Sequence, residues 1–150
     1  EHFGRKFYKV FFNKMNQIMT DNGKFLLHTI GVVDKPTPPN KFINKYIFPG
    51  GFCPSLSQII VPLEKTGLIV SDTETLIRHY DKTLESWLHR FLDRKNEVKD
   101  LFDEKFVKMW EFYMASCAAA FRYRDLVVFQ LQIVKNFQSA HRTRDYIYKT

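Results

Sequence analysis

Apolar residues near the start of the chain follow two different patterns. From Arg5 to Thr20 they recur every three or four residues, which predicts an amphipathic helix. The face of this helix that we expect to be buried carries Phe7, Val10, Phe11, Met15, Ile18 and Met19. From Lys24 to Ile30 the apolar residues are instead continuous, which predicts a short strand in a sheet covered on both faces.

Prolines and glycines divide the next part of the chain into short elements. Three prolines predict a loop over residues 33–40. A short helix is predicted over residues 41–48, and Pro49-Gly50-Gly51 breaks it.

A second helix and strand are predicted before the middle of the chain. Ser55 caps the helix, with Gln58 as its capping-box partner, and its buried face carries apolar residues. Pro62 should kink or shorten this helix, and Gly67 ends it. A strand is then predicted over residues 68–71 or slightly beyond.

Two long helices and a third strand are predicted in the second half. The first helix runs from Tyr80 to about Lys99, and the second runs from its acidic N-cap, Asp103, to about Tyr123. The residues expected to be buried are Leu84, Trp87, Leu88, Phe91 and Leu92 in the first helix and Phe106, Met109, Trp110, Tyr113, Met114, Cys117 and Phe121 in the second. Alternating apolar residues predict the strand over residues 126–134.

The order of these elements predicts an α/β fold. It is the order expected of the second half of a doubly wound domain rather than of a complete one. The sheet has about three strands, and the first strand lacks a neighbour on one side. The glycine-rich turn from strand to helix that binds a nucleotide is absent, because Gly50-Gly51 follows a helix. The polar, basic tail 136–150 is expected to be partly frayed.

Composition and charge narrow the class of protein. The chain has 150 residues, of which 45% are hydrophobic and 26% charged, as in globular domains. It has no apolar run near the roughly 20 residues of a membrane span and no secretory signal, and its start at Glu1 suggests a piece of a longer protein. Cys53 and Cys117 lack metal-ligand spacing, so no metal site and a reduced, cytoplasmic location are expected. The net charge of +7 favours an anionic partner, namely nucleic acid, an anionic membrane or a phosphorylated ligand.

His28 stands at the carboxyl end of the first predicted strand, in the segment His28-Thr29-Ile30-Gly31. Open α/β sheets bind ligands in the crevice at this end of their strands. The imidazole is therefore a candidate ligand-binding group, and a hydrogen-bonded structural histidine is the alternative. Tyr80 has the same two interpretations at the start of its helix.

Several separate motifs occur along the chain in a fixed order. They are Glu1–Gly4 (EHFG), Phe25–Gly31 (FLLHTIG), Lys45–Gly51 (KYIFPGG), Pro54–Leu56 (PSL), His79–Leu84 (HYDKTL), Met109-Trp110 with Tyr113, and Cys117–Arg122 (CAAAFR). From Glu1 to about Ile133, the chain closely resembles the carboxy-terminal half of the cyclopropane-fatty-acyl-phospholipid synthases, a family that includes the mycolic acid cyclopropane synthases. The fixed order makes this resemblance far more specific than any single motif.

The resemblance implies a class I, Rossmann-like methyltransferase that depends on S-adenosylmethionine (SAM). Members of this family transfer a methyl group to a cis double bond of a phospholipid acyl chain and close a cyclopropane ring, with bicarbonate as the base. By motif matching, Glu1, His28, the backbone of Ile30 and Tyr80 are implied to bind bicarbonate. The family's cysteine ligand to this ion belongs to the amino-terminal half, so neither cysteine of this chain takes that role.

The resemblance also implies where substrate and cofactor bind. Phe48, Gly50 and Gly51 are implied to lie beside the acyl channel, where an aromatic ring can stabilise a carbocation. Residues 1–135 are implied to be the carboxy-terminal part of the catalytic domain, followed by the basic tail. SAM is implied to be held mainly by the amino-terminal half, with no cofactor-binding residue in this chain. We therefore expect the 150-residue chain alone to bind no SAM and to be inactive.

The expected partners are phospholipid acyl chains and an anionic membrane surface, with the protein peripheral at the inner face of the membrane. Two other functions remain open. One is a related methyltransferase that acts on a lipid or another small molecule without closing a ring, and the other is a basic helical module that binds nucleic acid. The aromatic residues lie on apolar helix faces rather than among exposed basic residues, so no nucleic-acid partner is expected. The unpaired edge of the first strand is a candidate dimer contact.

Overall fold

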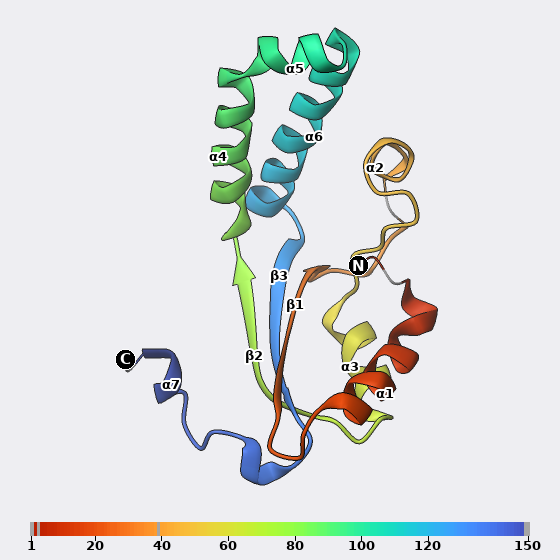
Figure 1. Ribbon diagram of the computed structural model, residues 1–150, viewed down its shortest axis with the longest axis vertical. Helices are drawn as coiled ribbons and strands as arrows, with labels where there is room; N and C mark the ends of the chain where they lie inside the picture. Colours follow the sequence, from red (N-terminus) through yellow and green to blue (C-terminus); the bar gives the residue numbers. More distant parts are fainter. Residues whose placement is uncertain (1, 3, 39, 149–150) are drawn as a thin grey trace. The chain divides into compact units, whose positions relative to one another are not determined.

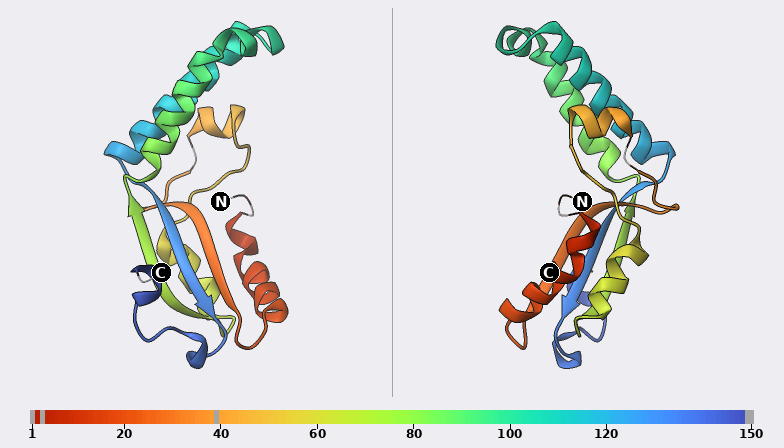
Figure 2. Two further views of the ribbon diagram at one scale, coloured as in Figure 1. Left: turned by 60° about the vertical axis from the view of Figure 1, so that its left-hand side comes forward. Right: turned by 90° about the vertical axis from the view of Figure 1, so that its right-hand side faces the viewer.

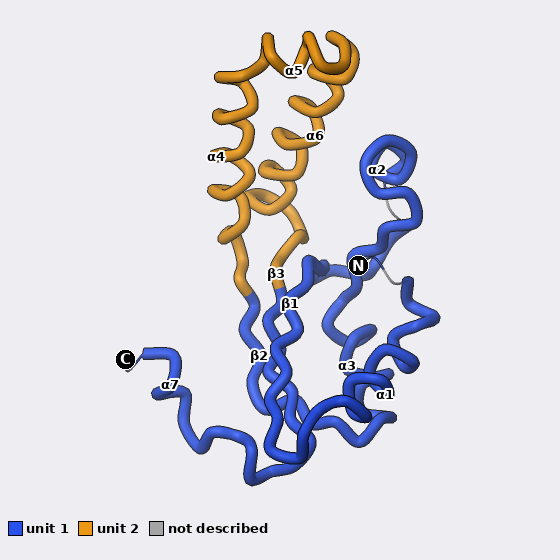
Figure 3. Tube along the Cα trace, in the orientation of Figure 1, with its two compact units in different colours: residues 1–75, 129–150 blue, residues 76–128 orange. Residues whose placement is uncertain are grey.

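A computed structural model of the chain describes residues 2, 4–38 and 40–148 (Figure 1). The predicted α/β class is confirmed, because helices alternate with the three strands of one sheet. The chain divides into two compact units (Figure 3), formed by residues 1–75 with 129–150 and by residues 76–128. The first unit holds most of the sheet, and the second is largely helical.

Among the described residues β1 (Lys24–Val32) lies at one edge of the sheet, as predicted, and Val32 at its end forms an isolated bridge with Ser55. With β2 (Ile69–Ile77) and β3 (Leu126–Val134), the strands lie in the order β1-β3-β2. β1 and β2 run in the same direction, and β3 runs between them in the opposite direction (Figure 2). β3 has its predicted bounds, whereas β2 continues well beyond the predicted end at Ser71. The added residues alternate in exposure and include several polar side chains, which is typical of an edge strand and made them resemble a loop.

One face of the sheet is covered by two helices, α1 (Tyr8–Ile18) and α3 (Leu56–Glu64), which pack against each other (Figure 2). α1 follows a 3-10 turn, η1 (Arg5–Phe7). The core residues contributed by the two helices are Tyr8, Phe12, Ile59 and Leu63. Phe129, Leu131 and Ile133 alternate along β3 and are also buried. The apolar periodicities of helix and strand therefore meet in one core.

Gly31 is required by a close approach within this core. A Cβ atom at position 31 would lie 2.3 Å from the ring carbon Cε2 of Phe129 and 2.6 Å from the carbonyl oxygen of Pro54. The same region is fixed by a hydrogen bond from the Val32 N–H to that oxygen, at 2.9 Å. Only glycine lets β1, β3 and the segment before α3 approach this closely.

The prediction of which residues of the first helix are buried is wrong, because the buried side is displaced by about one residue along the sequence. Phe7, Val10 and Ile18 were expected to be buried, but they are 49%, 64% and 61% exposed. Tyr8 and Phe12 are buried in their place, while the remaining members of the predicted face are half-buried. Apolar residues occur on more than one side of this helix, so their spacing alone did not identify the side that meets α3 and β1.

The expected coverage of β1 on both faces is also wrong for the described residues. Phe25, Leu27 and Thr29 point toward the helices, whereas Leu26 is 59% exposed and His28 is exposed. Burial therefore alternates along the first half of the strand, although its sequence is continuously apolar. The alternation follows from the pleat of a strand with helices on one side.

The short elements between the strands match their predictions. α2 (Lys41–Tyr46) lies within the predicted range. The capping box of α3 is confirmed, with the Ser55 N–H donating to the Gln58 side-chain oxygen at 3.1 Å. Pro62 lies inside α3, and the helix ends two residues later at Glu64, in agreement with a shortened helix.

The expectation of a frayed tail is wrong for residues 136–148. This segment forms η2 (Phe137–Ser139) and α7 (Asp145–Tyr148). The carboxylate of Asp72 on β2 accepts hydrogen bonds from the Arg144 guanidinium at 2.8 Å and from the Tyr146 hydroxyl at 2.7 Å. These contacts attach the tail to the sheet.

The second unit contains α4 (Tyr80–Asp93), α5 (Lys95–Leu101) and α6 (Glu104–Tyr123), and α4 packs along α6. The predicted N-cap is confirmed, because the Asp103 carboxylate accepts from the Phe106 N–H at 2.6 Å. The predicted helix to about Lys99 is wrong, since the chain leaves the helical conformation at Arg94 and begins α5. Two residues expected to be buried in α4, Trp87 and Leu92, are 42% and 37% exposed, whereas Leu84 is buried.

Candidate functional site

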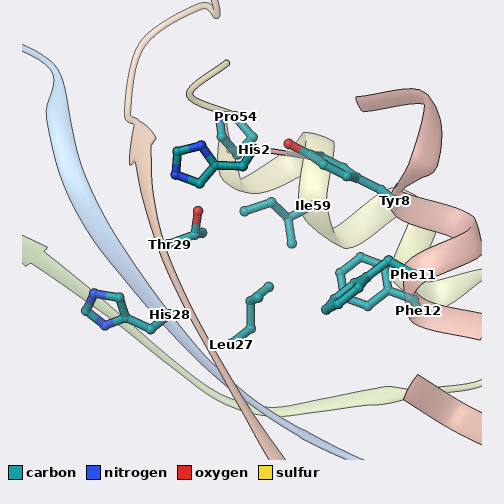
Figure 4. A pocket seen from close by; sticks show the side chains of 9 residues that line it. All are labelled: His2, Tyr8, Phe11, Phe12, Leu27, His28, Thr29, Pro54 and Ile59. Carbon is teal, nitrogen blue, oxygen red and sulfur yellow. The ribbon is translucent and has the colours of Figure 1, made fainter. Parts of the chain in front are cut away.

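His28 lies on β1 with its ring on the face of the sheet opposite α1 and α3. Figure 4 shows the imidazole pointing away from the neighbouring cavity and the Thr29 side chain pointing toward it. The amide nitrogen of Gln130, on the adjacent strand β3, lies 3.2 Å from His28 Nδ1. An amide nitrogen only donates, so the neutral ring accepts at Nδ1 and carries its proton on Nε2. The exposed imidazole therefore presents an N–H to a ligand.

Ile30 joins His28 on the same face of β1, two residues further along the strand. The Thr29 hydroxyl donates to the Ile30 carbonyl oxygen at 3.0 Å and packs on the other face of the strand. His28 and Ile30, two of the four residues implied to bind bicarbonate, thus lie two positions apart on β1. Glu1, another of the four, lies outside the described residues.

The predicted substrate residues form an ordered turn after α2, in the same unit. The Gly50 N–H donates to the Asn44 side-chain oxygen at 2.9 Å, and the Gly51 N–H donates to the Phe48 carbonyl at 3.0 Å. Gly50 has a φ of 76°, which favours glycine. The Phe48 ring is 42% exposed, and the His2 ring packs edge-on against it with centroids 5.6 Å apart. An aromatic face is therefore presented by a rigid turn.

Tyr80, the fourth predicted site residue, belongs to the second unit and begins α4. Its ring packs against Phe121 and Trp87, with centroid distances of 5.3 Å and 5.9 Å. Burial raises the pKa of the nearby Tyr113 to about 12, with Cys117 and Tyr80 contributing. Tyr80 is thus held by aromatic neighbours from α4 and α6.

An ion pair next to Tyr80 was not predicted from the sequence. The guanidinium of Arg122 lies 2.9 Å from the Asp81 carboxylate, which is buried, and 3.3 Å from the exposed carboxylate of Glu85. The hydrogen bond from Arg122 holds the pKa of Asp81 below its ordinary value of 3.8. Arg122 therefore links α6 to α4.

A cavity of about 180 Å³ lies in the first unit between β1 and the helices, and His28 is among its lining residues although its ring points away in Figure 4. Most of the residues that line it are apolar, and two are histidines: His2, Tyr8, Phe11, Phe12, Leu27, His28, Thr29, Pro54 and Ile59. Its mostly apolar walls offer few groups to pair with the charged sulfonium or the carboxylate of SAM. The described residues therefore do not fit SAM at this cavity.

The comparison with known families identifies the chain. A family described as mycolic acid cyclopropane synthetase matches residues 1–131. The chain belongs to this family. Its resemblance to cyclopropane synthases, stated above from motifs, is thereby confirmed.

Two curated relatives match different lengths of the chain. The chain is 36% identical to the cyclopropane-fatty-acyl-phospholipid synthase of Escherichia coli K12 over 142 residues, which is 95% of this chain and 37% of that protein. It is 43% identical to the tuberculostearic acid methyltransferase UfaA1 of Mycobacterium tuberculosis over 96 residues, 63% of this chain and 22% of that protein. The chain thus spans well under half the length of these relatives.

A solved structure from the cyclopropane synthetase family supports the fold. The mycolic acid cyclopropane synthase CmaA1, complexed with SAH and CTAB, matches 89% of this chain and 51% of its own chain. The TM-score is 0.81 at 29% sequence identity. The chain therefore has the class I methyltransferase type of α/β fold, as predicted.

Proposed function

We propose that this chain is part of a SAM-dependent methyltransferase that adds a methylene group across a cis double bond of phospholipid acyl chains. The observation that carries this proposal is the His28 imidazole, which lies within the family motif and has its Nε2–H directed outward by the contact with Gln130. Membership in the cyclopropane synthetase family supplies the reaction class. The named activity of the relative from Escherichia coli supplies the substrate class.

The donor set around His28 fits a small oxyanion. The exposed Nε2–H donates to an anionic oxygen, and Gln130 fixes the tautomer that makes this donation available. The backbone of Ile30 is a further proposed ligand, and Glu1 is proposed by the family motif to accept the O–H of bicarbonate. Tyr80 is a candidate ligand by the same motif. Bicarbonate, when bound there, supplies a base for the proton that leaves the transferred methyl group.

Phe48 is proposed to face the substrate. Its exposed ring stands on a turn fixed by the contacts of Gly50 and Gly51. Methyl transfer to an alkene leaves a carbocation, and an aromatic face within about 6 Å stabilises a cation by about 0.5–2 kcal/mol. SAM supplies the methyl group, and in this proposal the remainder of the protein holds it.

Lipid analysis of cells that express the complete protein tests the function. We expect a new fatty acid carrying a cyclopropane ring, and we expect His28→Ala to reduce its formation by about 100-fold or more through loss of the oxyanion contact. Leu26→Ala is the matched control, because Leu26 is exposed on the same face of β1 two residues away. Unchanged fatty acids with the unsubstituted protein would rule the proposal out.

Methylation without ring closure is a second candidate function. It is favoured by the 43% identity to a tuberculostearic acid methyltransferase, which exceeds the identity to the cyclopropane synthase over a shorter span. Proton NMR of the modified fatty acid separates the two outcomes, because cyclopropane ring protons appear far upfield of chain methylene and methyl protons. A branched methyl signal without ring protons would favour this second function.

A further inference from the structure

The first helical segment carries charge of only one sign. Residues 2–20 include four basic side chains, Arg5, Lys6, Lys9 and Lys14, and no acidic residue. Lys6, Lys9 and Lys14 are exposed on η1 and α1. An ordinary solvated helix carries both signs of charge, which stabilise it through pairs three or four residues apart.

Apolar side chains share this exposed surface with the lysines. Phe7, Val10 and Ile18 are 49%, 64% and 61% exposed, while Tyr8 and Phe12 hold the opposite side of the helix in the core. Val10 follows Lys6 and precedes Lys14 by four residues, so the three lie in one row along the helix. The Lys6 ammonium lies over the Phe7 ring at 5.0 Å from its centroid.

Cationic and apolar side chains on one exposed helix face are typical of helices that lie at a membrane interface. The apolar groups enter the headgroup region, and each basic side chain near an anionic surface strengthens the binding. Charge complementarity favours an anionic surface as the partner of this helix face, because a neutral or cationic partner would leave these lysines without opposite charges.

The second unit provides a comparison within the same chain. Leu101 and Phe102, between α5 and α6, are 77% and 62% exposed. Residues 90–111 around them hold six basic and six acidic side chains, and ion pairs such as Lys99 with Glu104 join the two signs. That apolar surface therefore has no net charge to attract an anionic bilayer.

We propose that the outer face of η1 and α1 docks on an anionic phospholipid surface. This face, called the basic face below, consists of Lys6, Phe7, Lys9, Val10, Lys14 and Ile18. The assignment rests on the proposed function, since a phospholipid substrate makes a bilayer the relevant anionic surface. It adds the residues through which the protein reaches that substrate.

Co-sedimentation with vesicles tests the basic face directly. The full chain is mixed with vesicles of phosphatidylcholine alone or with added phosphatidylglycerol, at low and high salt. We expect binding only to the anionic vesicles and loss of that binding at high salt. Lys9→Glu/Lys14→Glu should weaken the binding by about 30-fold or more, at about fivefold for each basic side chain removed.

Two further variants separate the basic face from general charge effects. Lys105→Glu/Lys108→Glu makes the same change in net charge at exposed positions of α6, and it should leave vesicle binding within about threefold of the unsubstituted chain. Val10→Gln removes an exposed apolar side chain without a cost to the core, and it should weaken binding while leaving its salt dependence.

The outcomes distinguish this inference from the proposed function. Equal loss in the α6 variant, equal binding to neutral vesicles, or tighter binding to RNA than to anionic vesicles would overturn the docking face. Methylation of detergent-dispersed lipid by the complete protein, without vesicle binding through the basic face, would leave the proposed function intact and reject the docking face. Vesicle binding through the basic face, in a complete protein that never modifies lipid, would support the docking face and reject the proposed function.

Discussion

At the scale of single residues, the sequence located His28 but not the group that orients it. The family motif pointed to the imidazole, whereas its predicted position at the carboxyl end of the strand is wrong, because β1 continues to Val32 and His28 lies in its middle. Gln130 is 102 residues away in the sequence and follows no motif or charge pattern. Only the pairing of β1 with β3 brings its amide to Nδ1, so pairing of the strands had to be known first.

Gln130→Leu tests whether this contact sets the tautomer of His28. Without the amide donor, we expect the Nδ1-protonated form to become populated and turnover of the complete protein to fall by about 10- to 100-fold, as for other partners that orient a functional histidine. Nitrogen NMR shifts of the His28 ring report the tautomer, and the kcat and KM of lipid modification report its consequence.

Gln132→Leu is the matched control for that experiment. Gln132 lies on the same strand and face, but its side chain accepts a hydrogen bond from Ser71 at 2.9 Å. It should lower stability without changing the ring nitrogen signals of His28. An unchanged tautomer in Gln130→Leu would show that the contact has no positioning role.

At the scale of elements, the sequence predicted most helices and strands and missed how their faces meet. The outer residues Phe7, Val10 and Ile18 have the apolar character and spacing of a buried face. Burial was decided instead by the contact of α1 with α3 and β1, which selects Tyr8 and Phe12. Periodicity measures how apolar residues repeat along one helix, and it carries no information about which neighbour that helix meets.

The ion pair between α4 and α6 leads to a pH-dependent stability. Asp81 has a pKa below its ordinary value of 3.8 because Arg122 donates to its carboxylate. Its contribution to stability is therefore complete above its unfolded-state pKa and is lost as pH falls through the lower folded-state pKa. Asp81→Asn should lower the midpoint of thermal unfolding at pH 7, and its difference from the unsubstituted chain should shrink below pH 3.8.

Glu85→Gln is the control for this pair, because Glu85 approaches the same guanidinium from an exposed position. Exposed ion pairs contribute about 0–1 kcal/mol, so this variant should unfold close to the unsubstituted chain at every pH. Thermal unfolding followed by circular dichroism from pH 3 to 7 makes both measurements. A pH-independent effect of Asp81→Asn would contradict an ionic link between the helices.

At the scale of the whole molecule, the number of strands and the fold class followed from the sequence, because each strand has a distinct apolar segment bounded by turns. The order β1-β3-β2 did not follow, since it places the last strand between the other two. Pairing of β1 with a second copy through its outer edge is still a prediction. The chain also covers 37% of the length of its Escherichia coli relative. The activity of that relative therefore involves a protein with many residues that have no counterpart in this chain.

Titration calorimetry with SAM tests whether the cofactor is bound by residues outside this chain. We expect no saturable heat when SAM is added to the 150-residue chain, because no glycine-rich turn from strand to helix follows β1, β2 or β3. The complete protein should bind SAM under the same conditions, and circular dichroism should show that the 150-residue chain is folded during the titration. Micromolar binding by this chain alone would mean that its own strands form the cofactor site. Methyl transfer would then take place on the face of the sheet that carries His28.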